Sequence, residues 1–135
     1  MQRHSFRFAI AIALGSVLAI PNVAFGESVQ LAAGFQTETR SGMSGGTRNS
    51  NDCGFVSATP NHQLQLTEDF SYLRLSVAGE GQPTLVVVGP SSDDRFCARN
   101  TPQQSGYWPQ GTYDIYVGNL DGGSHPYTLS ISEIP

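Results

Sequence analysis

Short runs in which every second residue is apolar recur along this chain, and turn-forming glycines and prolines separate them. The clearest run starts within the segment Tyr107–Gly118, YWPQGTYDIYVG. Pro109 and Gly111 suit a tight turn, because proline presets φ and glycine closes the turn. Beyond the turn, a period of two is typical of a half-buried β-strand, so the chain is predicted to be built from strands. One face of this strand is made of Tyr113, Ile115 and Val117, and the other is made of Thr112, Asp114 and Tyr116.

The remaining runs predict an all-β fold, because no stretch outside the first 26 residues has a helical period over a useful length. The continuous β-branched run Thr84–Val88 is typical of a central strand buried on both faces. Seven or eight short strands, with a turn about every 8 to 12 residues, indicate an antiparallel β-sandwich. The other predicted strands are Val29–Phe35, Gln63–Thr67, Tyr72–Val77, Phe96–Cys97 and Tyr127–Ile131, and ordered structure is expected to resume at Cys53–Val56.

Two polar segments show no apolar period and are predicted to be loops. The longer is Gln36–Asp52, which is rich in Gly, Ser, Thr and Asn and is expected to be a surface loop within the domain. Long loops inside compact domains often carry function or are disordered. The second predicted loop is Asn100–Gly106, which leads into the segment described first.

The first 26 residues have the features of a secretory signal peptide. Arg3 and Arg7 supply a positive start, Phe8–Ile20 supplies an apolar core, and Ala24–Gly26 supplies small residues for cleavage. The apolar core of 13 residues is shorter than the roughly 20 that a membrane span needs. The sequence therefore predicts cleavage after Gly26, a periplasmic or secreted location, and one domain at residues 27–135.

The predicted mature chain is acidic. Residues 27–135 contain five arginines, no lysine and eleven acidic residues, which gives a formal charge of −6. Such a chain is expected to avoid nucleic acid and anionic membrane surfaces, although it could attract cations. A monomer is expected, and an exposed edge strand is the feature that could instead make a dimer.

Cys53 and Cys97 are expected to form a disulfide, because an exported chain meets an oxidising compartment and two cysteines allow one pairing. Their spacing differs from the C-x-x-C motif that a redox site usually uses. In the chain-entropy model, closing a loop of this length stabilises the fold by about 4 kcal/mol. The predicted role of the disulfide is therefore structural.

Several motifs taken together resemble the bacterial pre-peptidase C-terminal domain, and the likeness covers about residues 63–133. The most specific is the Pro-x-Gly-x-Tyr turn that enters a strand. The motifs are Leu73-x-Leu75-x-Val77, Pro83–Val87, Cys97, Trp108-Pro109-x-Gly111-Thr112-Tyr113-x-Ile115-Tyr116-Val117-Gly118 and Tyr127-x-Leu129-x-Ile131. Cys53-Gly54-Phe55, together with the Ser44-Gly45-Gly46 loop, resembles a stand-alone exported variant of that domain.

This resemblance implies a small jelly-roll-like sandwich with an accessory role in binding, secretion or positioning rather than in bond cleavage. It also implies a pair of aspartates just after the second cysteine. This chain has Ala98, Arg99 and Asn100 at those positions, so it lacks the acidic pair there.

A serine hydrolase is the enzymatic alternative. Ser44 lies in Gly42–Gly46, which matches the G-x-S-x-G pattern, and His62 or His125 could serve as its base. That motif needs a strand-to-helix turn in an α/β sheet, and no helix is predicted here. Both histidines stand in turn-like contexts and are expected to be exposed. The prediction is therefore that the protein has no catalytic residues and is not an enzyme.

No cofactor is predicted, and calcium is the alternative. Asp93 and Asp94 lie in one predicted turn and Asp121 in another, and calcium takes six to eight oxygen ligands, often from acidic loops. Arg95 and Arg99 lie close enough in sequence to neutralise these acids. Aspartates also cap turns by bonding to their own backbone, which is the alternative explanation of their positions.

Four aromatic residues are the predicted ligand-binding candidates: Tyr72, Tyr107, Trp108 and Tyr116. By the alternation they occupy outward or loop positions, where flat rings suit stacking on sugars or anchoring a protein. Trp108 is instead expected to cap the core, since tryptophan is highly buried on average, which leaves Tyr107 as the better exposed contact. The predicted function is an exported accessory module that binds an envelope protein, a secreted peptidase or a polysaccharide.

Overall fold

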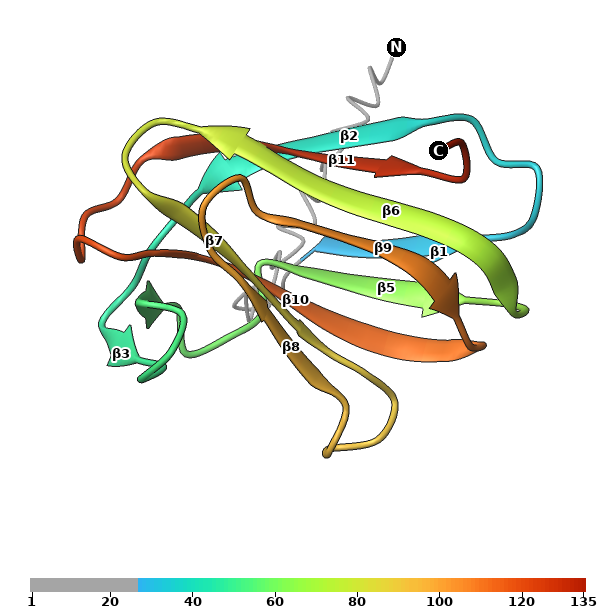
Figure 1. Cartoon of the computed structure of the whole chain (residues 1–135), viewed down its shortest axis with the longest axis horizontal. Helices are drawn as coiled ribbons and strands as arrows, with labels where there is room; N and C mark the ends of the chain where they lie inside the picture. The colour runs from blue at the N-terminus through green and yellow to red at the C-terminus, as the bar shows by residue number, and fades with distance from the viewer. Residues whose placement is uncertain (1–26) are drawn as a thin grey trace, which may run out of the picture.

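The structure is a computed structural model and describes residues 27–135; the predicted signal peptide, residues 1–26, lies outside the described residues. Eleven strands form two sheets, and the described residues hold no helix long and apolar enough to cross a membrane (Figure 1). The strands are β1 (Glu27–Leu31), β2 (Glu38–Met43), β3 (Arg48–Asn49), β4 (Phe55–Val56), β5 (His62–Leu66), β6 (Phe70–Gly79), β7 (Pro83–Val88), β8 (Arg95–Ala98), β9 (Gln103–Trp108), β10 (Gly111–Asn119) and β11 (Pro126–Ser132).

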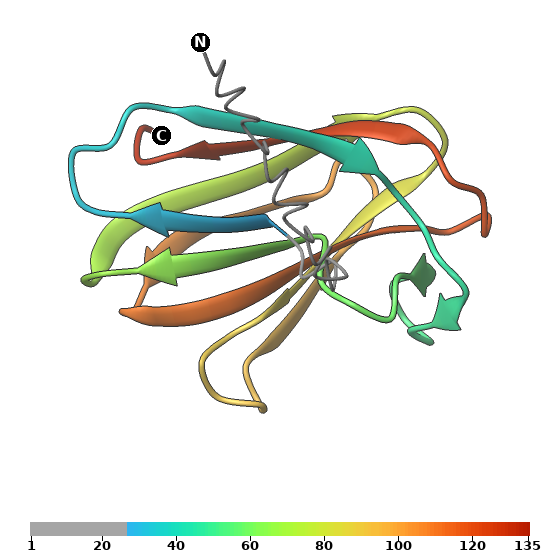
Figure 2. The same ribbon diagram turned by 180° about the vertical axis from the view of Figure 1, so that it is seen from behind.

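The first sheet has seven strands and the second has four. In the first sheet β10 is central: it pairs with β5 on one side and with β7 on the other, β1 and β8 form the two outer edges, and the short β4 and β3 follow at its end. The second sheet has the order β2-β11-β6-β9. All pairs are antiparallel except β1 with β5, which are parallel. Figures 1 and 2 show the two sheets stacked as a sandwich, which confirms the predicted fold class.

One apolar core lies between the sheets. The first sheet contributes Leu64, Leu85 and Ile115, and the second contributes Leu75 and Leu129, all fully buried. The predicted alternation along Tyr113, Ile115 and Val117 is confirmed, since each of these side chains belongs to this core. Burying apolar surface at about 25 cal/mol per Å² makes this shared core the main source of stability.

The predicted central strand, β7, is buried on both faces. Leu85 and Val87 face the main core, while Val86 packs on the outside against Cys53 and Val56. The predicted Cys53–Cys97 disulfide is formed there, with 5.9 Å between the Cα atoms. It ties β8 to the segment that leads into β4, so the outer face of β7 is covered by a small second cluster rather than by another sheet.

The prediction of a loop at Gln36–Asp52 is wrong over Glu38–Met43, which forms β2, and over the short β3. The inward positions of β2 are Glu38, Arg40 and Gly42, so the strand has a period of two in exposure but none in apolarity. Arg40 Nε lies 2.6 Å from Glu27 Oε1 on β1, and its guanidinium also pairs with Glu38. Gly42 stands opposite Tyr127 of β11, whose ring fills the space that an apolar side chain would occupy.

The predicted loop at Asn100–Gly106 is also wrong in its second half, because β9 begins at Gln103. This strand lies at the edge of the second sheet, pairs with β6 and begins with the polar residues Gln103, Gln104 and Ser105. The first predicted strand is shorter than expected. It ends at Leu31, and the chain then turns through Gly34, which has a φ of +85°.

Candidate binding site between two strand edges

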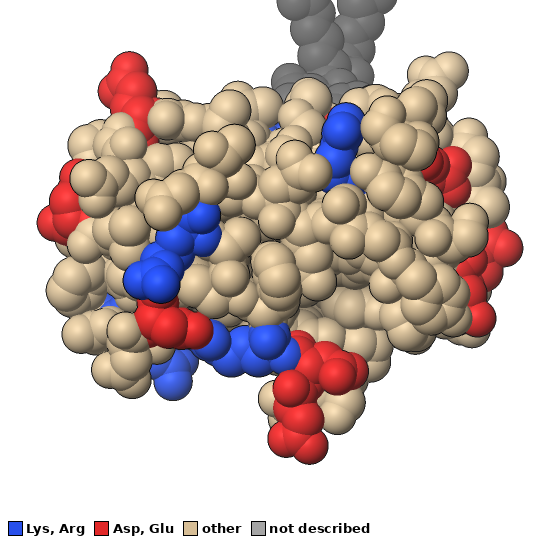
Figure 3. All heavy atoms as spheres, in the orientation of Figure 1, with Lys and Arg blue, Asp and Glu red and all other residues tan. Residues whose placement is uncertain are grey.

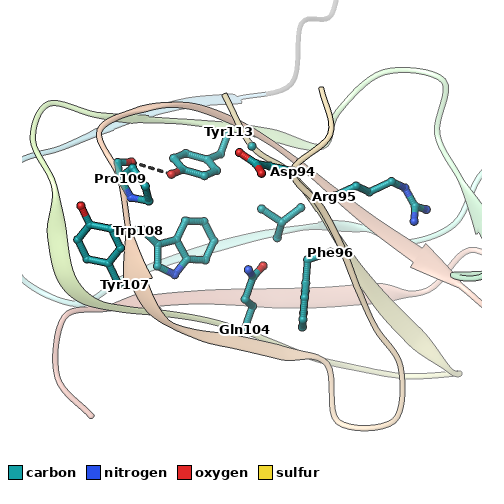
Figure 4. Close-up of a pocket in the computed structure, with 10 residues that line it drawn as sticks. Asp94, Arg95, Phe96, Gln104, Tyr107, Trp108, Pro109 and Tyr113 are labelled. Atoms are coloured by element: carbon teal, nitrogen blue, oxygen red, sulfur yellow. Dashed lines mark hydrogen bonds between the residues drawn. The ribbon is translucent and has the colours of Figure 1, made fainter. Parts of the chain in front are cut away.

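A cleft of about 330 Å³ opens where the free edges of the two sheets face each other. One wall is β8, the edge of the first sheet, and the other is β9, the edge of the second. We call it the β8–β9 cleft (Figure 4). Its lining residues are Val87, Gly89, Asp94, Arg95, Phe96, Gln104, Tyr107, Trp108, Pro109 and Tyr113.

Two aromatic rings form the inner end of the cleft. The ring centroids of Trp108 and Tyr113 lie 4.9 Å apart, with the planes tilted by 55°. The Tyr113 hydroxyl donates a hydrogen bond of 2.6 Å to the carbonyl of Pro109, which closes the predicted Pro-x-Gly-x-Tyr turn. Burial raises the pKa of Tyr113, and the nearby charge of Asp94 raises it further. Both rings are therefore held in fixed positions before any ligand arrives.

Three other side chains give the cleft its mixed character. Phe96 is 39% exposed, so its ring offers apolar surface to a ligand. The Oε1 atom of Gln104 is buried and has no hydrogen-bond partner among the described residues. Figure 4 shows Gln104 between Trp108 and Phe96, with Asp94 beside Tyr113 at the other end. An aromatic floor with an unused amide oxygen and a carboxylate at the rim suits a ligand that has both apolar faces and hydroxyl groups.

The structure brings together some of the predicted aromatic candidates and separates others. Tyr107 and Trp108 both line the β8–β9 cleft, but they lie on opposite sides of β9. Tyr107 is 62% exposed as expected, whereas Trp108 is 3% exposed, which confirms its place in the core and corrects its assignment to an outward position. Tyr116 lines a different cleft on the outer face of the first sheet, and Tyr72 lines another hollow beside Phe70.

The acidic candidates do not converge. Asp93 and Asp94 lie in the turn between β7 and β8, whereas Asp121 lies in the turn between β10 and β11, at another corner of the molecule (Figures 1 and 2). Asp121 accepts the backbone N–H of Gly123 at 2.8 Å and lies 3.6 Å from the ring of His125. Over residues 27–135, no three His, Cys, Asp or Glu side chains are grouped in a way that could hold a metal ion.

Ser44 and His62 have structural partners. Ser44 is buried, and its Oγ accepts hydrogen bonds of 3.3 Å from Asn119 Nδ2 and from the backbone N–H of His125. The expectation that His62 is an exposed turn residue is wrong: it lies on β5, is 2% exposed, and shares a 2.6 Å hydrogen bond with the Tyr127 hydroxyl. Burial lowers the pKa of His62, since a charged imidazole loses its hydration there.

Two functional candidates, Phe96 and Gln104, were missed by sequence reasoning. Phe96 pairs across the hairpin with Val87, so extending the alternation of β7 through the turn places it on the inner face. Gln104 lies in the segment predicted to be a loop, and no periodic signal marks it. The first could be found from the sequence, and the second depends on the pairing of β9 with β6.

Comparison with known proteins supports this architecture. No family model matches the chain. An uncharacterized protein of Synechococcus elongatus is 50% identical over 101 residues, which cover 68% of this chain and 72% of that protein. The crystal structure of the pre-peptidase C-terminal domain of collagenase from Bacillus anthracis matches with a TM-score of 0.55 and 18% identity, over 79% of this chain and 94% of that domain. This match confirms the expected fold.

Proposed function

The chain belongs to the family of the uncharacterized Synechococcus elongatus protein and has a pre-peptidase C-terminal domain fold, and we propose that it is an exported, non-catalytic module that binds a saccharide. The site is the β8–β9 cleft. A sugar ring has one face of C–H groups and an edge of hydroxyls. The C–H face would lie on the cleft's aromatic surface, and the hydroxyls would bond to its polar atoms.

The observation that carries this proposal is the buried Gln104 Oε1 beside the rings of Trp108 and Phe96. Leaving a buried acceptor without a donor costs about 1–3 kcal/mol, and a ligand hydroxyl would remove that cost. An extended peptide could also enter a cleft between two free strand edges. The saccharide is favoured because the unused group is a side-chain amide set between aromatic rings, whereas a peptide would mainly use the backbone.

Export is supported by the signal-like first 26 residues and by the disulfide, which is typical of oxidising compartments. The absence of catalysis is supported by the contacts of Ser44, whose hydroxyl holds two turns together. A nucleophile needs its hydroxyl exposed to substrate and bonded to a base, and this burial opposes that role.

The test uses the chain's single tryptophan as the reporter. Because Trp108 lines the β8–β9 cleft, its fluorescence should change when a sugar ring enters. The oxidised protein is titrated with neutral tetrasaccharides built from hexose and from N-acetylhexosamine. We expect a saturating change with at least one of them, and Phe96→Ala should weaken binding by about tenfold through the lost ring contact.

The matched control is Met43→Ala, which removes an exposed apolar side chain on β2, away from the cleft. It should leave the dissociation constant within about twofold of wild type. Equal loss in both variants would contradict the proposed site. If no saccharide changes the fluorescence of Trp108 while extended peptides bind saturably, the ligand is a polypeptide and not a saccharide.

A further inference from the structure

A second cleft, of about 340 Å³, lies on the outer face of the first sheet. One side is the turn from β3 to β4, and the floor is formed by outward side chains of β7 and β10. We call it the arginine cleft, after Arg48 and Arg95 at its rim. Its lining residues are Arg48, Asn49, Ser50, Asn51, Val56, Val86, Val88, Arg95 and Tyr116.

The turn that forms one side of this cleft is held rigidly. The Cys53–Cys97 disulfide ties it to β8, and Arg95 makes two hydrogen bonds of 2.6 and 2.7 Å to the carboxylate of Asp52. Within the turn, Ser50 Oγ donates to the Gly54 carbonyl at 2.6 Å and accepts from the Cys53 N–H at 3.0 Å. The cleft is therefore formed before a ligand binds, which lowers the entropic cost of binding.

Basic side chains gather around this cleft, although the domain as a whole is acidic. Figure 3 shows most of the basic groups on the visible face gathered around β3 and β8. Three of the five arginines in residues 27–135 lie here, namely Arg48, Arg95 and Arg99, and the carboxylates of Asp52, Asp94 and Asp114 lie near them. This gathering of arginines stands out in a domain whose formal charge is −6.

Of the two arginines that line the cleft, Arg48 is the one available to bind a ligand. It is exposed, and no carboxylate of the described residues lies within 4.0 Å of its guanidinium, whereas Arg95 is already paired with Asp52. Beside it stands the partly buried ring of Tyr116, and the amides of Asn49 and Asn51 complete the rim. A guanidinium binds carboxylate or sulfate oxygens through two parallel hydrogen bonds, and an aromatic ring supports a sugar face.

We propose that the arginine cleft binds an oxyanion, a carboxylate or a sulfate, carried on a sugar ring that packs against Tyr116. This inference rests on the proposed saccharide binding and adds that the natural saccharide is acidic. Arg95 lines both clefts, so they are neighbours on the two faces of the β7–β8 hairpin. One saccharide chain that crosses the edge strand β8 can therefore present a ring to the β8–β9 cleft and an anionic ring to Arg48.

The experiment compares acidic saccharides with their neutral counterparts by isothermal titration calorimetry at low salt. The carboxylate pair is tetragalacturonate and its methyl ester; the sulfate pair is dextran sulfate and dextran, with sodium sulfate as the free anion. We expect at least one acid to bind about tenfold more tightly than its neutral partner. Arg48→Gln should abolish that preference, and raising the salt should weaken it.

Arg74→Gln is the matched control, because it removes the same charge from β6 in the other sheet. It should keep the preference for the acid within about twofold. If both variants lose the preference for the acidic saccharide equally, the preference comes from the net charge of the protein and not from a site at Arg48, and the inference is overturned. If the neutral saccharides bind as tightly as their acidic counterparts, the inference is overturned and the proposed function stands. If no saccharide binds, both are overturned.

Discussion

The protonation of the buried residue His62 depends on the side chains that pack against it. Its Nε2 atom is bonded to the Tyr127 hydroxyl at 2.6 Å, and its Nδ1 atom lies 3.8 Å from Glu27 Oε2. Burial lowers the pKa of His62; the charge of Glu27 opposes this effect more weakly. On the other side of the bond, burial raises the pKa of Tyr127 to about 12, so both groups are neutral in the folded protein near neutral pH.

The stability of the domain should therefore fall on mild acidification. The unfolded chain binds a proton at His62 near its usual pKa of 6.5, whereas the folded chain binds it only at lower pH. The stabilisation is present above that value and is lost as the pH falls toward the folded pKa. Urea unfolding at about pH 7.5 and about pH 5.5 should show a drop in the free energy of unfolding for wild type and a smaller drop for His62→Gln. Equal drops in the two proteins would refute this assignment.

At this scale the sequence predicts which residues share a face but not what lies against that face. The alternation from Gln63 to Thr67 could be extended back to place His62 inward, yet the neighbouring Asn61 favoured a turn. Trp108 was assigned to the core on average burial alone, and this was confirmed. The partner of His62, Tyr127, is 65 residues away in sequence and lies on the other sheet, so only the packing of the two sheets reveals it.

At the scale of whole elements, strands β2 and β9 were not predicted from the sequence. Both are edge strands with few apolar residues, so neither gives the periodic signal on which strand prediction depends. The inward positions of β2 are occupied by contacts other than apolar packing of its own side chains: Arg40 forms an ion pair with Glu27, and the Tyr127 ring lies over Gly42. These contacts join segments distant in sequence. The well-predicted strands, such as β7, β10 and β11, carry their own apolar residues.

A substitution at Gly42 should therefore destabilise a strand that looks like a loop in the sequence. A Cβ atom there would lie 2.7 Å from the Tyr127 hydroxyl oxygen and 2.9 Å from Cζ, and the bond to His62 prevents the ring from moving freely. Gly42→Ala should cost about 1–3 kcal/mol of stability in urea unfolding. Ser41→Ala, on the exposed face of β2, should cost less than about 0.5 kcal/mol. If the two variants are equally stable, Tyr127 does not occupy this position in solution.

At the scale of the whole molecule, the two sides of the sandwich differ. On one side the Arg40–Glu27 ion pair bridges β2 and β1, the edges of the two sheets. On the other side β9 and β8 leave the β8–β9 cleft between them. The core is nevertheless continuous, because Trp108 and Tyr113 belong to the same cluster as Leu64 and Leu129. The cleft is thus an opening into the edge of a single core and not a boundary between two.

This continuity predicts that the domain unfolds as one unit. Trp108 reports on the open side of the sandwich, whereas far-ultraviolet circular dichroism reports on all the strands. With the disulfide intact, urea transitions followed by the two signals should coincide, as they do for a cooperative single domain. A tryptophan transition at clearly lower urea would show that the β8–β9 side opens on its own, as weakly packed regions do. The rings of the β8–β9 cleft would then be ordered by the ligand, and Phe96→Ala would change the folding of the site as well as its contacts.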